Sequence, residues 1–369
     1  MQEDFHYYAT YAAAYLAGYS HEEAMEICYS AQFVDLCSVT LLSKLKGPKS
    51  AATTQFQLEL MDHRTDILGL QEITKIWAAF HFLPRDLYAN KKGAGKRYLA
   101  KFRLICGPNG ELLKKTVELA KGRSLQSVGI AMHVLADTWA HTYFAGTPSL
   151  VINNTNYDFY ELVPDGDGFI KRKIRFRHKT SEPDDIENGL YTGSLFQTGE
   201  NSIMNLGHGR AGHFPDYSFA RYRYLPAWAD YRQVVKDNPS DYMKAFRQMV
   251  YAMKFIRSDE ESFETERYDT ESVDPYESRI KEILEKRQLN ACADWKAFGE
   301  ELSGQTIEDF DIEKYQQEYR TAQKGGKAKT FLGKFFYGAL SHKEMVSTNI
   351  KLSGNYLTGI PSVKRRGKG

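Results

Sequence analysis

The segment from Ser124 to Phe144 constrains the fold of this chain most, because it joins a strong helical pattern to three side chains able to bind metal. Its apolar residues recur at helical spacing. Within it, His133, Asp137 and His141 stand at positions i, i+4 and i+8. Four residues of an α-helix turn through about 400°, so each of these side chains is offset by about 40° from the one before. We therefore expect all three on one stripe of one helix.

The length of this stripe predicts more than one metal ion. His133 and His141 would lie about 12 Å apart along the helix axis. One zinc ion with bonds of about 2 Å cannot reach both imidazoles. The stripe thus indicates at least two ions with Asp137 as a bridging ligand, or one ion and an unrelated histidine. The alternative is a buried, hydrogen-bonded His-Asp-His stripe without metal.

A second group of candidate ligands lies in the glycine-rich segment Gly207 to Asp216. It contains His208 and His213, and the glycines and the proline around them predict a ligand-bearing turn rather than a helix interior. A structural turn with a surface histidine is the alternative. Arg210, in the same turn, is a candidate to bind a phosphate oxygen through two N–H groups, or is an ordinary surface arginine.

Further candidate ligands stand alone in the sequence. They are Asp4, His6, Asp35, His63 and His81. For each of them an ordinary capping or surface role is the alternative. We interpret His21, His178 and His342 as surface residues.

The remaining pattern predicts a mainly helical, all-α protein. Helices are expected over 5–18, 20–36, 124–144, 184–205, 227–237, 239–257, 275–302 and 328–340. Ser20 and Glu23 form a capping-box pattern at the start of the second of these helices. Residues 149–178 lack the helical spacing of apolar residues. Apolar and polar residues alternate there on both sides of a Pro-Asp-Gly turn, which predicts a β-hairpin insertion. We divide the chain into a helical catalytic domain over 1–257 and a helical extension over 258–369, with a basic tail at 361–369.

Composition excludes several classes of protein. The formal net charge of +2 is too small to indicate a nucleic-acid or membrane partner for the whole chain. The four cysteines show no CxxC spacing, so we expect no zinc bound through sulfur. No apolar run is long enough for a transmembrane helix. The first residues lack the pattern of a secretory signal, which predicts a cytoplasmic protein as synthesised, with delivery or secretion by another route left open. The oligomeric state is left undetermined.

Together these motifs resemble the zinc-dependent phospholipase C and single-strand nuclease superfamily, all-helical proteins with a three-zinc cleft that hydrolyse phosphodiesters. The resemblance rests on motifs spread over residues 4–216. It implies one zinc on His133, Asp137, Asp35 and His81, a second on Asp137 and His6, and a third on His141, His208 and Asp216. In that family the amino-terminal residue is also a ligand, and here Met1 or Asp4 would take this place.

The sequence departs from the family at three points. Asp137 and His141 are four residues apart, where the family usually has six. The last His and acid of the family stand four apart on a helix, whereas here they lie on the glycine-rich turn. His63 competes with His81, and His213 with His208, for their places as ligands.

The resemblance implies a zinc-dependent phosphoric diester hydrolase with two or three Zn²⁺ ions, most similar to phospholipase C. Asp137 would fix the metal separation and Asp35 would orient the attacking water. The substrate would be a phospholipid, and a peripheral membrane contact is compatible with this. The first alternative is a nuclease or nucleotide phosphodiesterase, favoured by the basic and aromatic segments 171–178 and 222–224. The second is a non-catalytic, metal-stabilised helical module.

Overall fold

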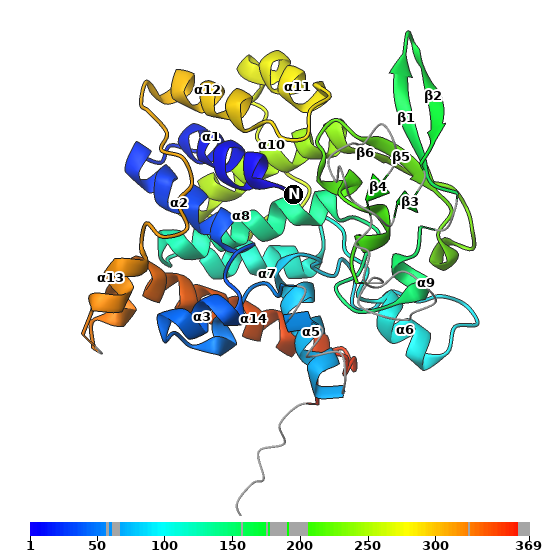
Figure 1. Cartoon of the computed structure of the whole chain (residues 1–369), viewed down its shortest axis with the longest axis horizontal. Helices are drawn as coiled ribbons and strands as arrows, with labels where there is room; N and C mark the ends of the chain where they lie inside the picture. Colours follow the sequence, from blue (N-terminus) through cyan, green and yellow to red (C-terminus); the bar gives the residue numbers. More distant parts are fainter. Residues whose placement is uncertain are drawn as a thin grey trace, which may run out of the picture.

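The computed structural model of the chain is mainly helical and carries a small antiparallel sheet at one side (Figure 1). The structure describes residues 1–56, 59–60, 67–155, 158–174, 176–177, 190–191, 206–323 and 325–360. The prediction of a mainly helical protein is confirmed. His63, His178 and the basic tail at 361–369 lie outside these residues. Of the helix predicted at 184–205 the structure describes only residues 190–191, which form a short strand.

Helix α8 (Leu125–Ala140) is the central element of the helical body. Almost every one of its residues is buried, because helices contact it on several sides. These neighbours are α2 (His21–Phe33), α5 (Ile67–Phe80), α7 (Glu111–Ala120), α10 (Asn238–Arg257) and α14 (Phe331–Leu352). The stripe of His133, Asp137 and His141 therefore lies inside the protein.

The amino-terminal helices follow the sequence pattern closely. A π-helical turn (Asp4–Ala9) leads into α1 (Thr10–Leu16). Helix α2 begins at the predicted capping box, in which the Ser20 hydroxyl accepts from the backbone N–H of Glu23 and the Glu23 carboxylate accepts from that of Ser20. Satisfying two free N–H groups fixes the first residue of the helix.

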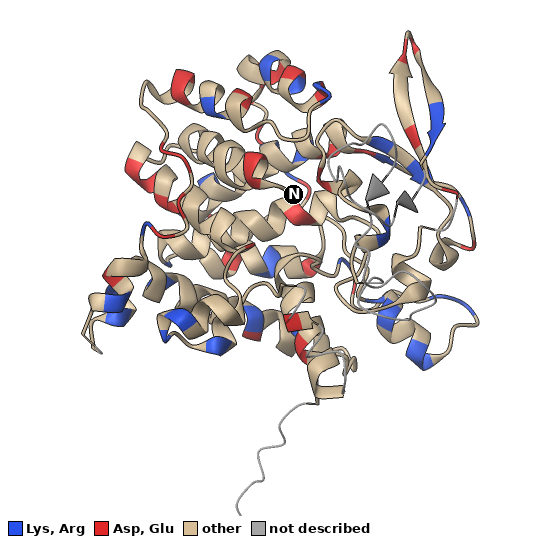
Figure 2. Cartoon of the chain, in the orientation of Figure 1, with Lys and Arg blue, Asp and Glu red and all other residues tan. Residues whose placement is uncertain are grey.

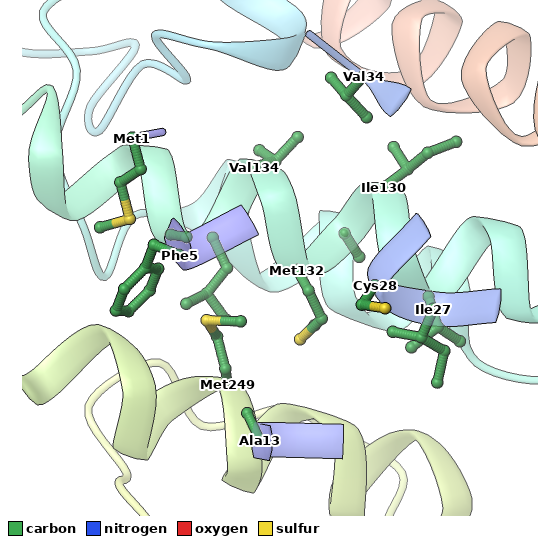
Figure 3. Packing of buried hydrophobic residues seen from close by; sticks show 14 of the residues in the cluster. Met1, Phe5, Ala13, Ile27, Cys28, Val34, Ile130, Met132, Val134 and Met249 are labelled. Carbon is green, nitrogen blue, oxygen red and sulfur yellow. The ribbon is translucent and has the colours of Figure 1, made fainter. Parts of the chain in front are cut away.

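Helices α2 and α8 approach each other closely at Gly129. A Cβ atom at this position would lie 2.3 Å from the carbonyl oxygen of Ile27 and 2.6 Å from Cβ of Ser30. Only glycine permits this separation. Figure 3 shows Ile27 of α2, Met132 of α8 and Met249 of α10 within one cluster of buried side chains.

The sheet is larger than the predicted hairpin. Strands β1 (Tyr160–Asp165) and β2 (Gly168–Lys173) form the hairpin within 149–178. However, β5 (Arg221–Tyr224) and β6 (Val234–Asp237) extend it to the order β2-β1-β5-β6. The helix predicted at 227–237 is therefore wrong, since the second half of this range pairs with β5. Two further short strands, β3 (Phe176–Arg177) and β4 (Leu190–Tyr191), pair in parallel.

The helices after residue 257 contribute to the same core as those before it. One cluster of buried apolar side chains runs from Met1 to Ile350. Further α-helices are α3 (Val39–Leu45), α6 (Lys96–Phe102), α9 (Leu150–Asn153), α11 (Glu277–Glu285), α12 (Cys292–Ser303) and α13 (Gln316–Thr321). The helix predicted at 328–340 is α14, which continues to Leu352. Among the described residues, no helix has the length and apolar character needed to cross a membrane.

Candidate metal centre

Helix α8 presents the predicted stripe into a buried cluster. His133, Asp137 and His141 are each at most 4% exposed. The Oδ2 atom of Asp137 lies 3.2 Å from Nε2 of His133 and 3.6 Å from Nδ1 of His141. His141 is the C-cap residue, one position past the regular helix. The amino terminus of the chain lies beside this part of α8 (Figure 1).

Three sets of histidine and aspartate side chains gather along the stripe, each with ligand atoms within 4.8 Å of one another. The first set is Asp35, His81 and His133, the second is His6, His133 and Asp137, and the third is His141, His208 and Asp216. Donor atoms that each stand about 2 Å from a common tetrahedral ion lie about 3.3 Å apart. Several donor atoms of these sets lie 3.1–3.4 Å apart. The described residues thus form a continuous group that could hold metal ions.

The first set lies where the ends of α2 and α5 meet α8. Asp35 follows α2, and His81 comes directly after the last residue of α5. The Nδ1 atom of His81 is 3.3 Å from both Nε2 of His133 and Oδ2 of Asp137. Asp35 places Oδ1 3.7 Å from the same His81 nitrogen, and its side chain is 29% exposed. Asp35 is thus the carboxylate of this set that reaches toward solvent.

The second set lies on the other oxygen of Asp137. Oδ1 of Asp137 is 3.1 Å from Nε2 of His6 and 2.7 Å from the backbone nitrogen of Met1. The Met1 nitrogen is also 3.3 Å from Oδ1 of Asp216. A positive charge therefore occupies the space between two buried carboxylates. With its two oxygens facing different histidines, Asp137 has the arrangement of a bridging ligand.

The third set joins α8 to the glycine-rich turn. Asp216 places Oδ1 3.1 Å from Nε2 of His141 and Oδ2 3.4 Å from Nε2 of His208. The turn fits here because Gly207, with a φ of +56°, lies against the ring of Phe82; a Cβ on Gly207 would stand 2.1 Å from that ring. The ring of Phe82 in turn stacks on His141 with centroids 4.6 Å apart.

Backbone carbonyls fix the tautomer of four of these histidines. A carbonyl oxygen only accepts, so the ring nitrogen facing it carries the proton and the other nitrogen keeps a lone pair. His133 donates to Ala31, His81 to Thr53, His141 to His81 and His208 to Gly212, over 2.6–3.0 Å. Each remaining nitrogen points at the carboxylates described above. This is the support that metal-binding histidines usually have.

The arrangement demands positive charge. The free ring nitrogens of His81 and His133 face each other at 3.3 Å. Two lone pairs at this distance repel unless a proton or a cation lies between them. Burial lowers the pKa of His208 to about 4, against the attraction of Asp216, so its ring is neutral at pH 7. Its lone pair therefore faces the carboxylate of Asp216 with no proton to share.

The same neighbouring charges set the pKa values of the two buried carboxyl groups, Asp137 and Asp216. Burial opposes ionisation of Asp137, but His141, the Met1 ammonium and further histidines together hold the pKa of Asp137 well below its usual value. Burial similarly opposes ionisation of Asp216, and His208 with the Met1 ammonium keeps its pKa low. Burial lowers the pKa of the Met1 ammonium, yet Asp137 and Asp216 outweigh it and raise that pKa to about 11. Ionised carboxylates within reach of histidine ring nitrogens form a donor set that a divalent cation can bind.

Other candidate residues lie differently. Asp4 is buried, and its oxygens accept from the backbone N–H groups of Phe5 and Ala291 rather than joining a set. Burial raises its pKa to about 6. The His213 side chain is 63% exposed, and its Nδ1 atom lies 3.2 Å from Oδ2 of Asp216. Arg210 has a buried Nε atom without a hydrogen-bond partner in the described part of the chain.

One histidine was misjudged from the sequence. His342 is 3% exposed, not a surface residue, and donates from Nε2 to the carbonyl of Ala79 at 2.8 Å. It lies on α14 where that helix packs against α5. It supports the end of the helix that leads to His81.

The fold and this cluster define a mainly helical protein with a buried histidine and aspartate centre able to hold metal ions. The chain belongs to the family DUF6765, a family of unknown function whose model matches residues 1–350. The match spans every residue of the three sets. No curated protein and no solved structure matches the chain.

Proposed function

We propose that this protein is a zinc-dependent phosphodiester hydrolase that acts on phospholipid-like substrates. The observation that supports it most is the pair His81 and His133, which direct free ring nitrogens at each other and at Asp137. In this proposal Asp35, His81 and His133 hold one ion with Asp137. His6 and the other oxygen of Asp137 hold a second, with the Met1 nitrogen beside them.

The third ion of the proposal is held by His141, His208 and Asp216. When bound, clustered Zn²⁺ neutralises phosphoryl oxygens and lowers the pKa of a coordinated water toward 7. Asp35, the partly exposed carboxylate, orients the attacking water and accepts its proton. The Arg210 guanidinium, whose Nε lacks a partner in the described chain, binds a non-bridging phosphate oxygen.

The burial of two tyrosines favours a lipid substrate over a nucleic acid. Tyr222 and Tyr224 were candidates to stack on bases, but both side chains are fully buried. Their rings pack against Phe159 in the second apolar cluster. Base stacking needs exposed ring faces. The nuclease alternative therefore loses the support that came from Tyr222 and Tyr224.

Metal analysis and a substrate panel test this proposal. Purified wild type should contain two or three equivalents of zinc and hydrolyse phosphatidylcholine faster than a single-stranded oligonucleotide or a chromogenic diester. Asp137→Asn should lose metal and nearly all turnover, because it removes charge from both oxygens of the bridge. Asp167→Asn, in the exposed turn of the hairpin, is the matched control and should resemble wild type.

The outcomes separate the alternatives. A metal-free wild type with folded structure contradicts the proposal. Zinc without turnover on any diester supports the non-catalytic, metal-stabilised module instead. Faster cleavage of the oligonucleotide than of the lipid supports the nuclease.

A further inference from the structure

A large pocket lies apart from the metal centre, between α5, α6 and the segment that follows α14. Its volume is about 990 Å³. The side chain nearest the centre along α5 is Thr74, seven residues before His81. Asn355, 2% exposed, donates to the carbonyl of Ala100 and holds the segment after α14 against α6. Four stretches of chain far apart in sequence thus line it, the fourth being Thr147 and Pro148.

All charged side chains that line this pocket among the described residues are positive. Lys96, Arg97, Lys101 and Arg103 line it from α6 and its end, and no aspartate or glutamate is among the described lining residues. Figure 2 shows these basic positions along α6. Lys96, Arg97 and Lys101 form no ion pair with any described residue. Uncompensated cations of this kind raise the local concentration of anions.

The other wall of the pocket is apolar. Ile67, Leu70, Leu357 and Tyr356 line it, and Ile67, Leu70 and Tyr356 are 73%, 38% and 54% exposed. Exposed aliphatic side chains gathered at one concave site usually mark a binding surface. A volume of this size is at the upper end of that for small-molecule sites. It exceeds what a phosphate group alone would fill.

We propose that this pocket binds a single anionic amphiphile, with its acyl or alkyl chain against α5 and its headgroup on the cations of α6. Charge complementarity selects the headgroup, and the apolar wall selects the chain. A concave site favours one inserted molecule over the flat surface of a bilayer. The proposal does not depend on the metal centre, because its residues belong to none of the three histidine and aspartate sets.

Calorimetric titration of the full chain with monododecyl phosphate, below its micellar concentration, tests the proposal. We expect saturable binding at one equivalent. Dodecyl maltoside, with the same chain and no charge, and inorganic phosphate, with charge and no chain, should each bind at least tenfold more weakly. The double variant Arg97→Gln and Lys101→Gln should weaken binding of monododecyl phosphate about fivefold or more, since it removes two of the four cations that line the pocket.

Two further variants complete the test. Ile67→Asp places a negative charge on the exposed apolar wall and should also weaken binding without unfolding the protein. Lys44→Gln with Lys49→Gln removes two exposed lysines elsewhere and should leave binding unchanged.

Three results overturn the proposal. Equal affinity for inorganic phosphate and monododecyl phosphate means a simple anion site. Binding only to micelles or to vesicles of phosphatidylglycerol means docking on a lipid surface. Absence of binding, or equal loss in the Lys44 and Lys49 control, means that the pocket recognises no such ligand.

Discussion

His81 and His133 turn ring nitrogens toward each other at 3.3 Å while each donates its opposite N–H to a backbone carbonyl. Neither ring can rotate to relieve this contact without leaving a buried carbonyl unpaired, which costs about 1–3 kcal/mol. The contact is stable only with a positive charge between the two nitrogens. A metal ion bound to both nitrogens would supply that charge.

Removing metal should therefore destabilise the protein. Dialysis against a chelator at pH 7.5 should lower the melting temperature by several degrees, and added Zn²⁺ should restore it. An ion present at a hundredfold excess over its dissociation constant adds about 3 kcal/mol to the free energy of unfolding. Differential scanning calorimetry measures the effect. An identical melting curve before and after dialysis, with metal absent in both samples, would contradict the metal centre.

The two histidines of the glycine-rich turn should behave differently. His208 is held by the Gly212 carbonyl and directs its lone pair at Asp216, whereas the His213 side chain is largely exposed. His208→Gln should lose about one equivalent of zinc, and His213→Gln, its matched control, should retain all of it. Elemental analysis of both variants decides this. Loss of metal from the His213 variant alone would reverse the assignment.

Gly129→Ala should destabilise the protein by about 2 kcal/mol or more, because the new Cβ would lie 2.3 Å from the carbonyl oxygen of Ile27. Helices α2 and α8 must separate to accept it. Since Asp35 follows α2 and His133 lies on α8, the same change should weaken metal binding. Urea denaturation measures the first effect. Gly326→Ala, which makes only an ordinary contact, is the control and should have little effect.

Stability should fall in acid partly through His342. Burial lowers its pKa from 6.5 to about 4, against the hydrogen bond to Ala79, so the folded state favours the neutral ring. The unfolded chain binds the proton first as the pH falls. The contribution is therefore complete above about pH 6.5 and is lost between there and pH 4.

The variant His342→Gln keeps a donor for the Ala79 carbonyl and removes this titration. Between pH 7 and pH 4.5 it should lose about 2–3 kcal/mol less stability than wild type. Urea midpoints at the two pH values provide the comparison. Equal losses in both proteins would show that the ring of His342 does not carry this pH dependence.

Local spacing predicted the parts of the site that one helix contains. His133, Asp137 and His141 lie on one stripe because helical geometry leaves no other arrangement for an i, i+4, i+8 series. The capping box at Ser20 was equally predictable, since both of its partners lie within four residues. The resemblance, not spacing, brought His6, Asp35 and His208 to the same stripe.

The rest of the site was not predictable, for physical reasons. The carbonyls of Ala31, Thr53 and Gly212 orient the histidines, and a backbone acceptor has no signature in sequence. Asp4 met the criteria for a ligand, but its oxygens accept backbone N–H groups, one of them from Ala291, almost three hundred residues away. The sequence predicted a helix where β6 forms, because this strand is stabilised by pairing with β5 and not by its own composition.

The residues of the centre come from distant parts of the chain, with separations of 52 residues between His81 and His133, 75 between His141 and Asp216, and 131 between His6 and Asp137. An ion held by such residues is a cross-link over long loops, and closing long loops is costly for an unfolded chain. We therefore expect the proposed zinc ion to be captured late, after α2 and α5 have docked on α8. When refolding is followed with a zinc-sensitive dye, zinc uptake should come after helical structure has formed. The ion would then stabilise helices that have already docked and would not initiate folding.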